Sequence, residues 1–440
     1  MSKPASGNRN VAVLALCLAI VGAAAMLYYH LHLFIPNVLQ TRAIKGLGKG
    51  YAFGADFYPI WLVARQWQVD HRDPYSAEMT REIQTGLFGR ALDAGNPSDP
   101  PAEYREFAYP AFTEVLLGPT AAIEFPTVRL VLAVLLPLLT VASLWFLTLA
   151  LQWRIDPRWF AVLVVLSLCN YPVLEAFFAE QPGLIAAFLL ASSLLALTHN
   201  HLSLAGGLLA LTLIKPQMTL LAAFYLMLWS LADRRRVRLL AGFLLTTLLM
   251  VGASLWIWPH WIGPWIKVLL GYHRYATPPL VALLPGATLG PYVGPIAIVG
   301  MLGVGAFLAW RNRQASVDSP NFWLTLSLLL AISSVTLLPG QAVYDHIILI
   351  PGIFLVLRYR RELRCGGRIP RTLLVLGTIV LCWQWVAALG VIAVHPWISS
   401  ARLATILTFP IRTAASLPFA VLALLFCAAK INLAESREVS

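Results

Sequence analysis

Residues 128–151 read VRLVLAVLLPLLTVASLWFLTLAL and contain a single charged residue, Arg129. A helix of this length rises about 36 Å, whereas the hydrocarbon core of a bilayer is about 30 Å thick. The run is apolar throughout, without the polar stripe of a soluble surface helix. It therefore predicts a helix that crosses a membrane.

Comparable apolar runs recur on both sides of this stretch. Of the 440 residues, 59% are hydrophobic and only 12% are charged, which excludes a soluble enzyme, a disordered chain and a small disulfide-framed module. We predict an all-α polytopic membrane protein that forms one domain over 1–440, with about twelve transmembrane helices. The predicted spans are 11–29, 128–151, 159–178, 182–198, 202–214, 216–232, 237–258, 292–310, 320–338, 347–358, 372–394 and 402–429.

Two of these assignments have alternatives. Lys215-Pro216 interrupts an apolar stretch from 202 to 232, which would be about 46 Å long as one helix and so too long for one span. Two short helices that meet at one membrane face fit better. The first span could also be a signal peptide, because Lys3 and Arg9 precede it and alanines end it; we favour an uncleaved helix.

The charges orient the spans. With both termini cytoplasmic, the inner segments 1–10, 152–158, 233–238, 311–319, 358–371 and 430–440 hold 18 of the 32 Lys and Arg but only 6 of the 20 Asp and Glu. The remaining 14 basic residues (32 − 18) balance the remaining 14 acidic ones (20 − 6). This is the positive-inside pattern, so the basic excess predicts topology rather than binding to nucleic acid.

The same orientation leaves two long segments outside, 30–127 and 259–291. The first contains a moderately apolar piece, 110–123, with Glu114 and Pro119 inside it. Counting that piece as a full span would invert the charge pattern of later helices, so we predict a re-entrant or interfacial helix within the outer loop.

Ionisable and polar residues lie where a membrane disfavours them, and such residues are functional candidates by default. Nearly all fall at the outer ends of predicted spans or in outer loops, which predicts one outward-facing polar site at membrane level. The full set of these polar residues is Asp56, Arg129, Glu175, Glu180, Gln181, Lys215, Asp345 and His346.

Several of these candidates also have purely structural interpretations. Asp56 could cap the helix that starts at the next residue. Arg129 could extend toward lipid headgroups or pair with Glu175. Trp61 and Arg65 lie one helical turn apart and could stack as an interfacial anchor.

Further structural alternatives concern the later segments. Asp345-His346 could be a turn with a hydrogen-bonded imidazole. The tryptophans at 256, 258, 261 and 265 indicate an interfacial belt more than a sugar platform. Lys215 is harder to explain structurally, because a lysine between two apolar runs needs an anion.

Five short stretches resemble, in order, a known family. They are GADFYPIWLVA (54–64) followed by DPY (73–75), YPAF (109–112), Glu180-Gln181, AGG (205–207) leading to IKP (214–216), and YDH (344–346). Together they resemble glycosyltransferase family 87, the polyprenyl-phosphate-mannose-dependent mannosyltransferases of the GT-C fold, over roughly residues 50–360. Ile60, Val63 and Glu180 depart from its usual residues, and Glu180 adds a negative charge beside the expected phosphate site.

The resemblance implies a GT-C architecture with a long first outer loop containing interfacial helices, and it places the catalytic base at Asp56. Cations would hold the departing phosphate, for which Lys215, His346 and Arg129 are the candidates. The remaining candidates for substrate binding are Gln181, Tyr58, Trp61, Arg65 and Asp345.

The chemistry can also be argued from the residues. A sugar transferred outside the cell's inner membrane has no cytosolic nucleotide sugar to draw on, so a lipid-phosphate sugar is the expected donor. One carboxylate base and direct displacement imply inversion at the anomeric carbon. The five cysteines form no CxxC pair, and no outer Asp-x-Asp pair suggests a divalent cation, so we expect neither metal nor cofactor.

The expected partners are thus a polyprenyl-phosphate sugar, a glycolipid or glycan acceptor and the lipid bilayer, with no nucleic acid. The expected location is the plasma membrane, with the site facing the periplasm or the exterior. The main alternative is a polytopic transporter or lipid flippase, and a non-catalytic scaffold is a second. The large outer loop and the nearly charge-free centres of most spans favour the enzyme.

Overall fold

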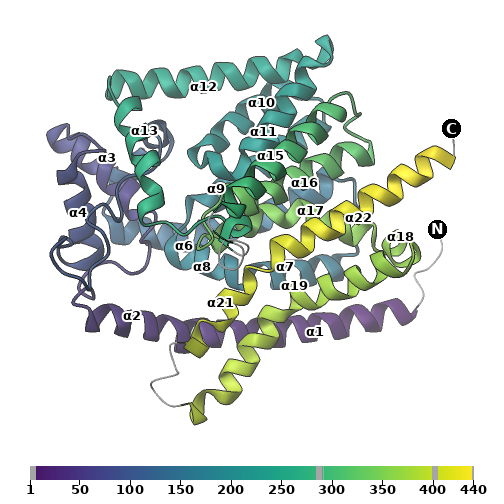
Figure 1. Cartoon of the computed structure of the whole chain (residues 1–440), viewed down its shortest axis with the longest axis horizontal. Coiled ribbons are helices and arrows are strands. Elements are labelled where there is room, and N and C mark those ends of the chain that lie inside the picture. The colour runs from purple at the N-terminus through teal and green to yellow at the C-terminus, as the bar shows by residue number, and fades with distance from the viewer. Residues whose placement is uncertain (1–5, 284–289, 291, 399–404, 439–440) are drawn as a thin grey trace.

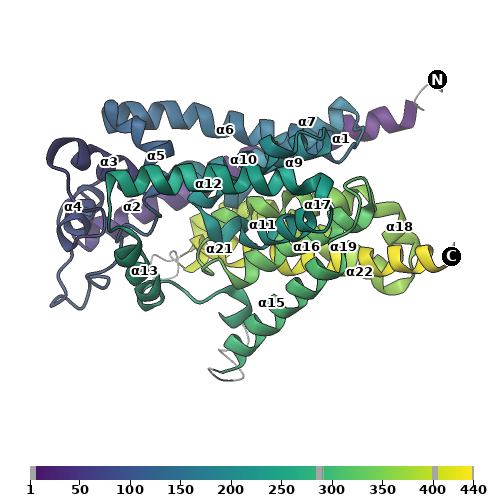
Figure 2. The same ribbon diagram turned by 90° about the horizontal axis from the view of Figure 1, so that it is seen from above.

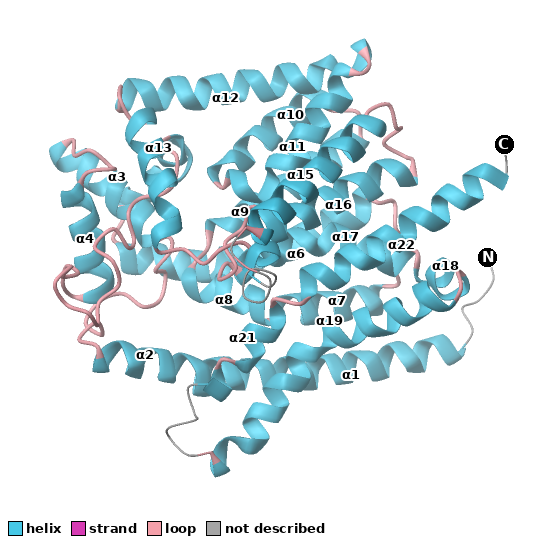
Figure 3. Ribbon diagram, in the orientation of Figure 1, coloured by secondary structure: helices cyan, strands magenta, loops and turns pink. Residues whose placement is uncertain are grey.

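The computed structural model describes residues 6–283, 290, 292–398 and 405–438. Within this part the regular structure is helical (Figure 3), and only an isolated bridge joins Pro279 to Pro339. Parts of the predicted segments 1–10, 259–291, 402–429 and 430–440 lie outside the described residues.

In the described part of the chain, six helical segments are long and apolar enough to cross a bilayer. They contain α1 (Ser6–Tyr28) with the π-helix η1 (Tyr29–Phe34) and α2 (Ile35–Ile44), α6 (Phe125–Ala150), α12 (Val237–Ile257), α15 (Val293–Arg311), α19 (Arg368–Val394), and α21 (Phe409–Ala414) with α22 (Leu417–Glu438).

A seventh candidate span is a bent pair. The sequence predicts one helix over 159–178, but the structure has α7 (Pro157–Leu168) and α8 (Tyr171–Ala179), which meet at 56°. Asn170 causes the break together with Pro172, because the Asn170 side chain accepts a hydrogen bond from the Val173 N–H and starts a new helix.

Four shorter apolar segments complete the bundle. They are α9 (Pro182–Thr198), α10 (Leu202–Leu211) with η3 (Thr212–Ile214), α11 (Pro216–Leu231) and α16 (Pro320–Thr336). The interruption predicted at Lys215 is confirmed, since one helix ends at Ile214 and the next begins at Pro216. The predicted span 347–358 consists of the end of η6 (Val343–Leu349) and the short α17 (Ile350–Arg358). The count of twelve spans remains a prediction.

The first helix is longer than the sequence indicates. The predicted span ends at 29 and the predicted loop starts at 30, but the chain stays helical through η1 and α2 to Ile44. The extra turns carry Leu31, Leu33 and Phe34 and so continue the apolar run. α1 packs against α7 and α19, which makes it part of the bundle.

The predicted outer segments gather at one end of the molecule (Figure 1, left). At this end lie α2, α3 (Tyr58–Asp70), α4 (Ala77–Phe88) and α13 (Ile262–Gly271), which is followed by η5 (Tyr272–Arg274). α5 (Phe112–Leu117), which is followed by η2 (Gly118–Ala122), packs beside α3 (Figure 2). The beginning of α1, the end of α22 and α18 (Arg360–Cys365) lie at the opposite end. In the perpendicular view α6 and α15 lie on opposite sides of the bundle (Figure 2).

The predicted inner segments also contact one another. The Gln152 amide lies 3.3 Å from an Asp318 carboxyl oxygen, Arg236 of η4 (Arg234–Arg236) donates to the Arg313 carbonyl, and Arg358 donates to the Leu151 carbonyl. The structure thus separates the two sets of segments that the charge pattern distinguishes.

Candidate active site

The loop before α3 places Asp56 against the end of α8. Gly54 has φ +74, a backbone conformation that favours glycine. Its N–H donates to the Phe178 carbonyl at 2.9 Å, and the Asp56 N–H donates to the Ala179 carbonyl at 3.1 Å. These bonds fix the start of the first outer segment next to the junction of α8 and α9.

The Asp56 carboxylate has two side-chain partners. Arg105 Nη1 donates to Oδ1 at 2.5 Å, and the Gln181 amide donates to Oδ2. The capping interpretation is wrong, because Phe57 is the N-cap of α3 and no side-chain capping bond is present there. Asp56 therefore faces other polar side chains instead of its own helix.

Gln181 also connects Asp56 to a buried lysine. Lys215 Nζ donates to Gln181 Oε1 at 2.7 Å and to Asp345 Oδ1 at 2.6 Å. Lys215 and Asp345 are both buried, and the ammonium lies 5.0 Å from the centre of the Tyr344 ring. One amide thus bridges a carboxylate and an ammonium.

The close approach of α9 to this ion pair requires a glycine at position 183. A Cβ added at Gly183 would lie 2.5 Å from Asp345 Oδ1, 3.2 Å from Met218 Sδ and 3.4 Å from Lys215 Nζ. Gly183 follows Pro182 in the first turn of α9, so the start of this helix forms one wall of the site.

Burial governs the electrostatics around this network. It raises the pKa of Asp345, and the Lys215 ammonium opposes that shift. It raises the pKa of Tyr109 and Tyr344 well above the usual value, and the charges of Asp56 and Asp345 add to the shift. Both phenols are therefore neutral hydrogen-bonding groups near the two carboxylates.

Residues 107–339, just over half of the chain, match the model of glycosyltransferase family 87. The chain belongs to glycosyltransferase family 87. Neither a curated protein nor a solved structure matched it. Membership in this family makes the protein a membrane glycosyltransferase, which uses a sugar donor and an acceptor. The same match argues against the transporter alternative.

The matched region of this family 87 glycosyltransferase includes Arg129, Gln181 and Lys215, but Asp56 precedes it and Asp345 follows it. The structure brings the two outlying carboxylates to the matched residues through direct hydrogen bonds. The hydrogen-bonded set Arg105–Asp56–Gln181–Lys215–Asp345 is called the site network below.

Two of the predicted phosphate ligands lie beside the site network. Arg129 forms an ion pair with Glu180 at 3.6 Å instead of Glu175, and its guanidinium lies 5.5 Å from the centre of the Phe53 ring. Burial raises the pKa of Glu180 to about 7, although Arg129 opposes the shift. Arg129 thus lies close enough to Glu180 to balance its negative charge.

His346 has a different environment from the one that the sequence suggests. It is buried, Nδ1 has no hydrogen-bond partner among the described residues, and burial lowers the pKa of the imidazole to about 4. His346 is therefore neutral near pH 7 in the empty site. Its role as a phosphate ligand remains a prediction.

Three predicted substrate ligands have structural partners. Trp61 Nε1 donates to the Ile123 carbonyl and Arg65 donates to the Ala121 carbonyl, each at 2.9 Å. Tyr58 is buried and stacks on Trp61 with ring centres 5.9 Å apart. These bonds fasten α3 to the segment after α5, and a substrate contact by any of the three stays a prediction.

The tryptophans of the predicted interfacial belt differ in exposure. Trp256 is 87% exposed, but Trp258 and Trp261 are buried. Trp258 packs on Trp67 of α3 and Trp261 packs on Phe112 of α5. The belt interpretation is therefore wrong for Trp258 and Trp261, because α12 and α13 fold back onto the outer segment.

Sequence reasoning missed Arg105 and Gly183 as site residues. Arg105 lies in a polar stretch with Glu103 and Glu106, where neither periodicity nor hydropathy distinguishes it from a solvated charge. The motif Gln-Pro-Gly at 181–183 could have indicated a close helix start, but its partner Asp345 is far along the chain.

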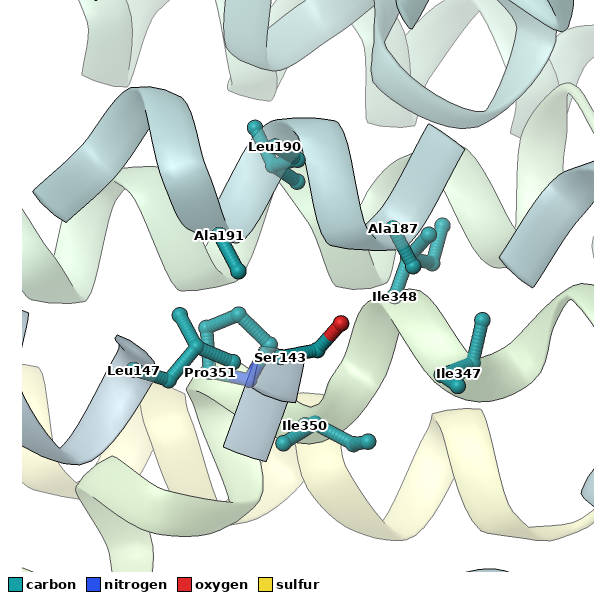
Figure 4. A pocket seen from close by; sticks show the side chains of 9 residues that line it. All are labelled: Ser143, Leu147, Ala187, Leu190, Ala191, Ile347, Ile348, Ile350 and Pro351. Carbon is teal, nitrogen blue, oxygen red and sulfur yellow. The ribbon is translucent and has the colours of Figure 1, made fainter. Parts of the chain in front are cut away.

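A separate crevice lies among α6, α9 and the segment from η6 to α17 (Figure 4). Its lining is apolar apart from Ser143, and it includes Leu147, Ala187, Ile347 and Pro351. It lacks the charged groups that a sugar phosphate requires. No group of three or more His, Cys, Asp or Glu in the described part of the chain could hold a metal, and metal independence stays a prediction.

Proposed function

We propose that this protein transfers a hexose from a polyprenyl-phosphate donor to a glycolipid or glycan acceptor at the outer face of the plasma membrane. The transfer inverts the anomeric carbon, and Asp56 is the general base. Mannose is the sugar that the resemblance to family 87 implies. Both termini are cytoplasmic in this proposal.

The observation that carries the proposal is the bridge from Asp56 through Gln181 to Lys215. Glycosyl transfer needs a base for the acceptor hydroxyl and a cation for the leaving group. The bridge holds one of each at neighbouring positions, with a neutral amide between them.

The bond changes follow from this arrangement. The acceptor oxygen attacks the anomeric carbon while its proton passes to the Asp56 carboxylate. The bond between the anomeric carbon and the phosphate oxygen breaks, and the phosphate leaves with the bonding electrons and is held by Lys215. Because the acceptor attacks the face of the anomeric carbon opposite the departing phosphate, a single displacement inverts this carbon.

The position of the bridge supports a lipid-linked donor. Gln181 stands at the junction of α8 and α9, and Lys215 at the junction of α10 and α11, so both lie at ends of apolar helices. A phosphate at the outer bilayer surface can reach such helix ends while its polyprenyl chain remains in the lipid.

The direct test is incubation of the purified protein in lipid nanodiscs with synthetic polyprenyl-phosphate hexoses and candidate glycolipid acceptors. We expect mass spectrometry to detect a glycosylated acceptor and free polyprenyl phosphate. Polyprenyl-phosphate mannose, glucose and galactose should be compared side by side, with nucleotide sugars as a negative control. Transfer from nucleotide sugars alone would overturn the proposal.

A further inference from the structure

Both oxygens of the Asp56 carboxylate are engaged in this structure, by Arg105 and by Gln181. A general base must come within about 2.6–3.2 Å of the hydroxyl that it deprotonates. The acceptor hydroxyl must therefore approach a carboxylate whose two oxygens each already have one donor.

Arg105 is the partner that can exchange. Gln181 is buried and its amide is bonded at both ends, to Asp56 and to Lys215. The Arg105 side chain is 30% exposed, and its Nε has no hydrogen-bond partner among the described residues. Arg105 therefore has an unused donor beside the site, whereas the Gln181 amide is held between Asp56 and Lys215.

The backbone on both sides of Arg105 is fixed. The Gln84 amide donates to the carbonyls of Ala102 and Tyr104 at 2.7 and 2.9 Å, and Trp265 Nε1 donates to the Ala108 carbonyl at 3.1 Å. A change of partner at Arg105 thus requires rotation of the side chain only.

The charges of the site network change when a donor binds. Asp56 and Asp345 balance Arg105 and Lys215 in the empty site. A polyprenyl-phosphate sugar is a phosphodiester with one negative charge, and loss of the sugar leaves a monoester that gains a second. Lys215 alone cannot balance that charge while it is paired with Asp345, so a second cation is required nearby.

We propose that Arg105 covers the Asp56 carboxylate in the empty site and moves to the donor phosphate when the lipid binds, which frees Asp56 for the acceptor. This inference rests on the proposed function. The guanidinium suits the task, because it binds phosphate oxygens through two parallel N–H bonds. Arg105 then acts both as a phosphate ligand and as a positioning residue for the base.

The first test measures binding of polyprenyl phosphate, without sugar, to the purified protein in nanodiscs. Arg105→Gln should weaken binding about 10- to 100-fold, the usual range for loss of a charge-assisted contact. Arg105→Lys keeps the charge and should restore part of the affinity. Arg274→Gln is the matched control, since Arg274 is an exposed arginine of the outer end paired with Glu103, and should bind like the wild type.

The second test measures the rate at which Asp56 is modified by a water-soluble carbodiimide and glycinamide. The protein contains no polyprenyl phosphate in this test, and peptide mass spectrometry detects the modification. Modification should be several-fold faster in Arg105→Gln than in the wild type and in Arg274→Gln. A loss of structure in Arg105→Gln would instead increase labelling of buried carboxyls such as Asp345.

The outcomes separate this inference from the proposed function. If the wild type binds polyprenyl phosphate but Arg105→Gln binds it equally well, or if Asp56 labelling does not rise in that variant, the role of Arg105 is refuted while the proposed function stands. If the wild type itself does not bind polyprenyl phosphate, both fail.

Discussion

At the scale of single residues, Asp56 is the decisive group, because its carboxylate faces polar partners and caps no helix. Asp56→Asn keeps the size of the side chain and the start of α3. We expect turnover to fall by about 10²–10⁴-fold, the range for loss of a general base. Binding of polyprenyl phosphate should be retained or become tighter, because Arg105 loses its charged partner at position 56. Turnover near the wild-type value would instead assign the base to another acid.

A matched control for this change is Asp93→Asn. Asp93 is an exposed acid in the same outer segment, and its carboxylate accepts a bond from the Gly95 N–H that an Asn oxygen can also accept. Turnover of Asp93→Asn should equal that of the wild type, which would exclude a general effect of removing charge from the outer end.

Glu114 gives a second prediction at this scale. It is buried, neither carboxyl oxygen has a hydrogen-bond partner among the described residues, and burial raises its pKa well above 4.5. The folded protein therefore keeps the proton at pH values at which the unfolded chain, with its ordinary pKa of 4.5, has already lost it. The stabilising contribution is therefore fully present below pH 4.5 and declines as the pH rises toward the folded pKa.

Glu114→Gln removes this dependence, because the amide stays neutral at every pH. The melting temperature of the variant relative to the wild type should increase between pH 5 and pH 8 in thermal unfolding experiments. Glu78→Gln changes an exposed carboxyl of α4 and should show no such trend. An equal pH dependence in Glu114→Gln and wild type would mean that Glu114 is ionised in the fold.

At the scale of elements, the start of α9 packs directly against the Lys215–Asp345 ion pair because residue 183 is a glycine. A Cβ there would overlap Asp345 Oδ1 at 2.5 Å, so Gly183→Ala should displace Asp345 from Lys215. We expect a loss of stability of about 1–3 kcal/mol and a marked loss of turnover. Denaturant unfolding and transfer assays measure both effects.

Gly390→Ala is the control for this change. Gly390 lies inside α19, and a Cβ at that position would meet no described atom within 4 Å. Because alanine favours helix over glycine by about 1 kcal/mol, this variant should be as stable as the wild type or more so. If Gly183→Ala equals Gly390→Ala in both unfolding free energy and turnover, α9 can shift without loss of stability or activity.

At the scale of the whole molecule, the charge pattern and the fold distinguish the same two ends. The segments with excess Arg lie together opposite α3, α4 and α13 (Figure 1). In intact cells an impermeant maleimide should not label Cys365 as the sole cysteine, but should label Ser98→Cys in a cysteine-free protein. Both positions are exposed in the fold, so the reverse pattern would invert the proposed topology.

The sequence by itself determined the helical class, most helix positions and the break at Lys215. These features are local, because the thickness of a bilayer sets the length of each apolar run and a proline fixes where a helix starts again. The placement of polar residues at membrane level indicated Asp56, Gln181, Lys215 and Asp345 as site candidates, and the family resemblance then assigned the catalytic base to Asp56. All four are in the site network.

Only the tertiary structure decided which groups meet. Asp56 is separated from Arg105 by 49 residues and from Gln181 by 125, and Lys215 is separated from Asp345 by 130. A charge in an outer segment has no local pattern that reveals its partner. For this reason the sequence does not indicate Arg105 as a partner of Asp56, and it suggests Glu175 instead of Glu180 as a possible partner of Arg129. Packing of helices distant in the sequence determines these pairs, because buried polar groups must find partners wherever the fold places them.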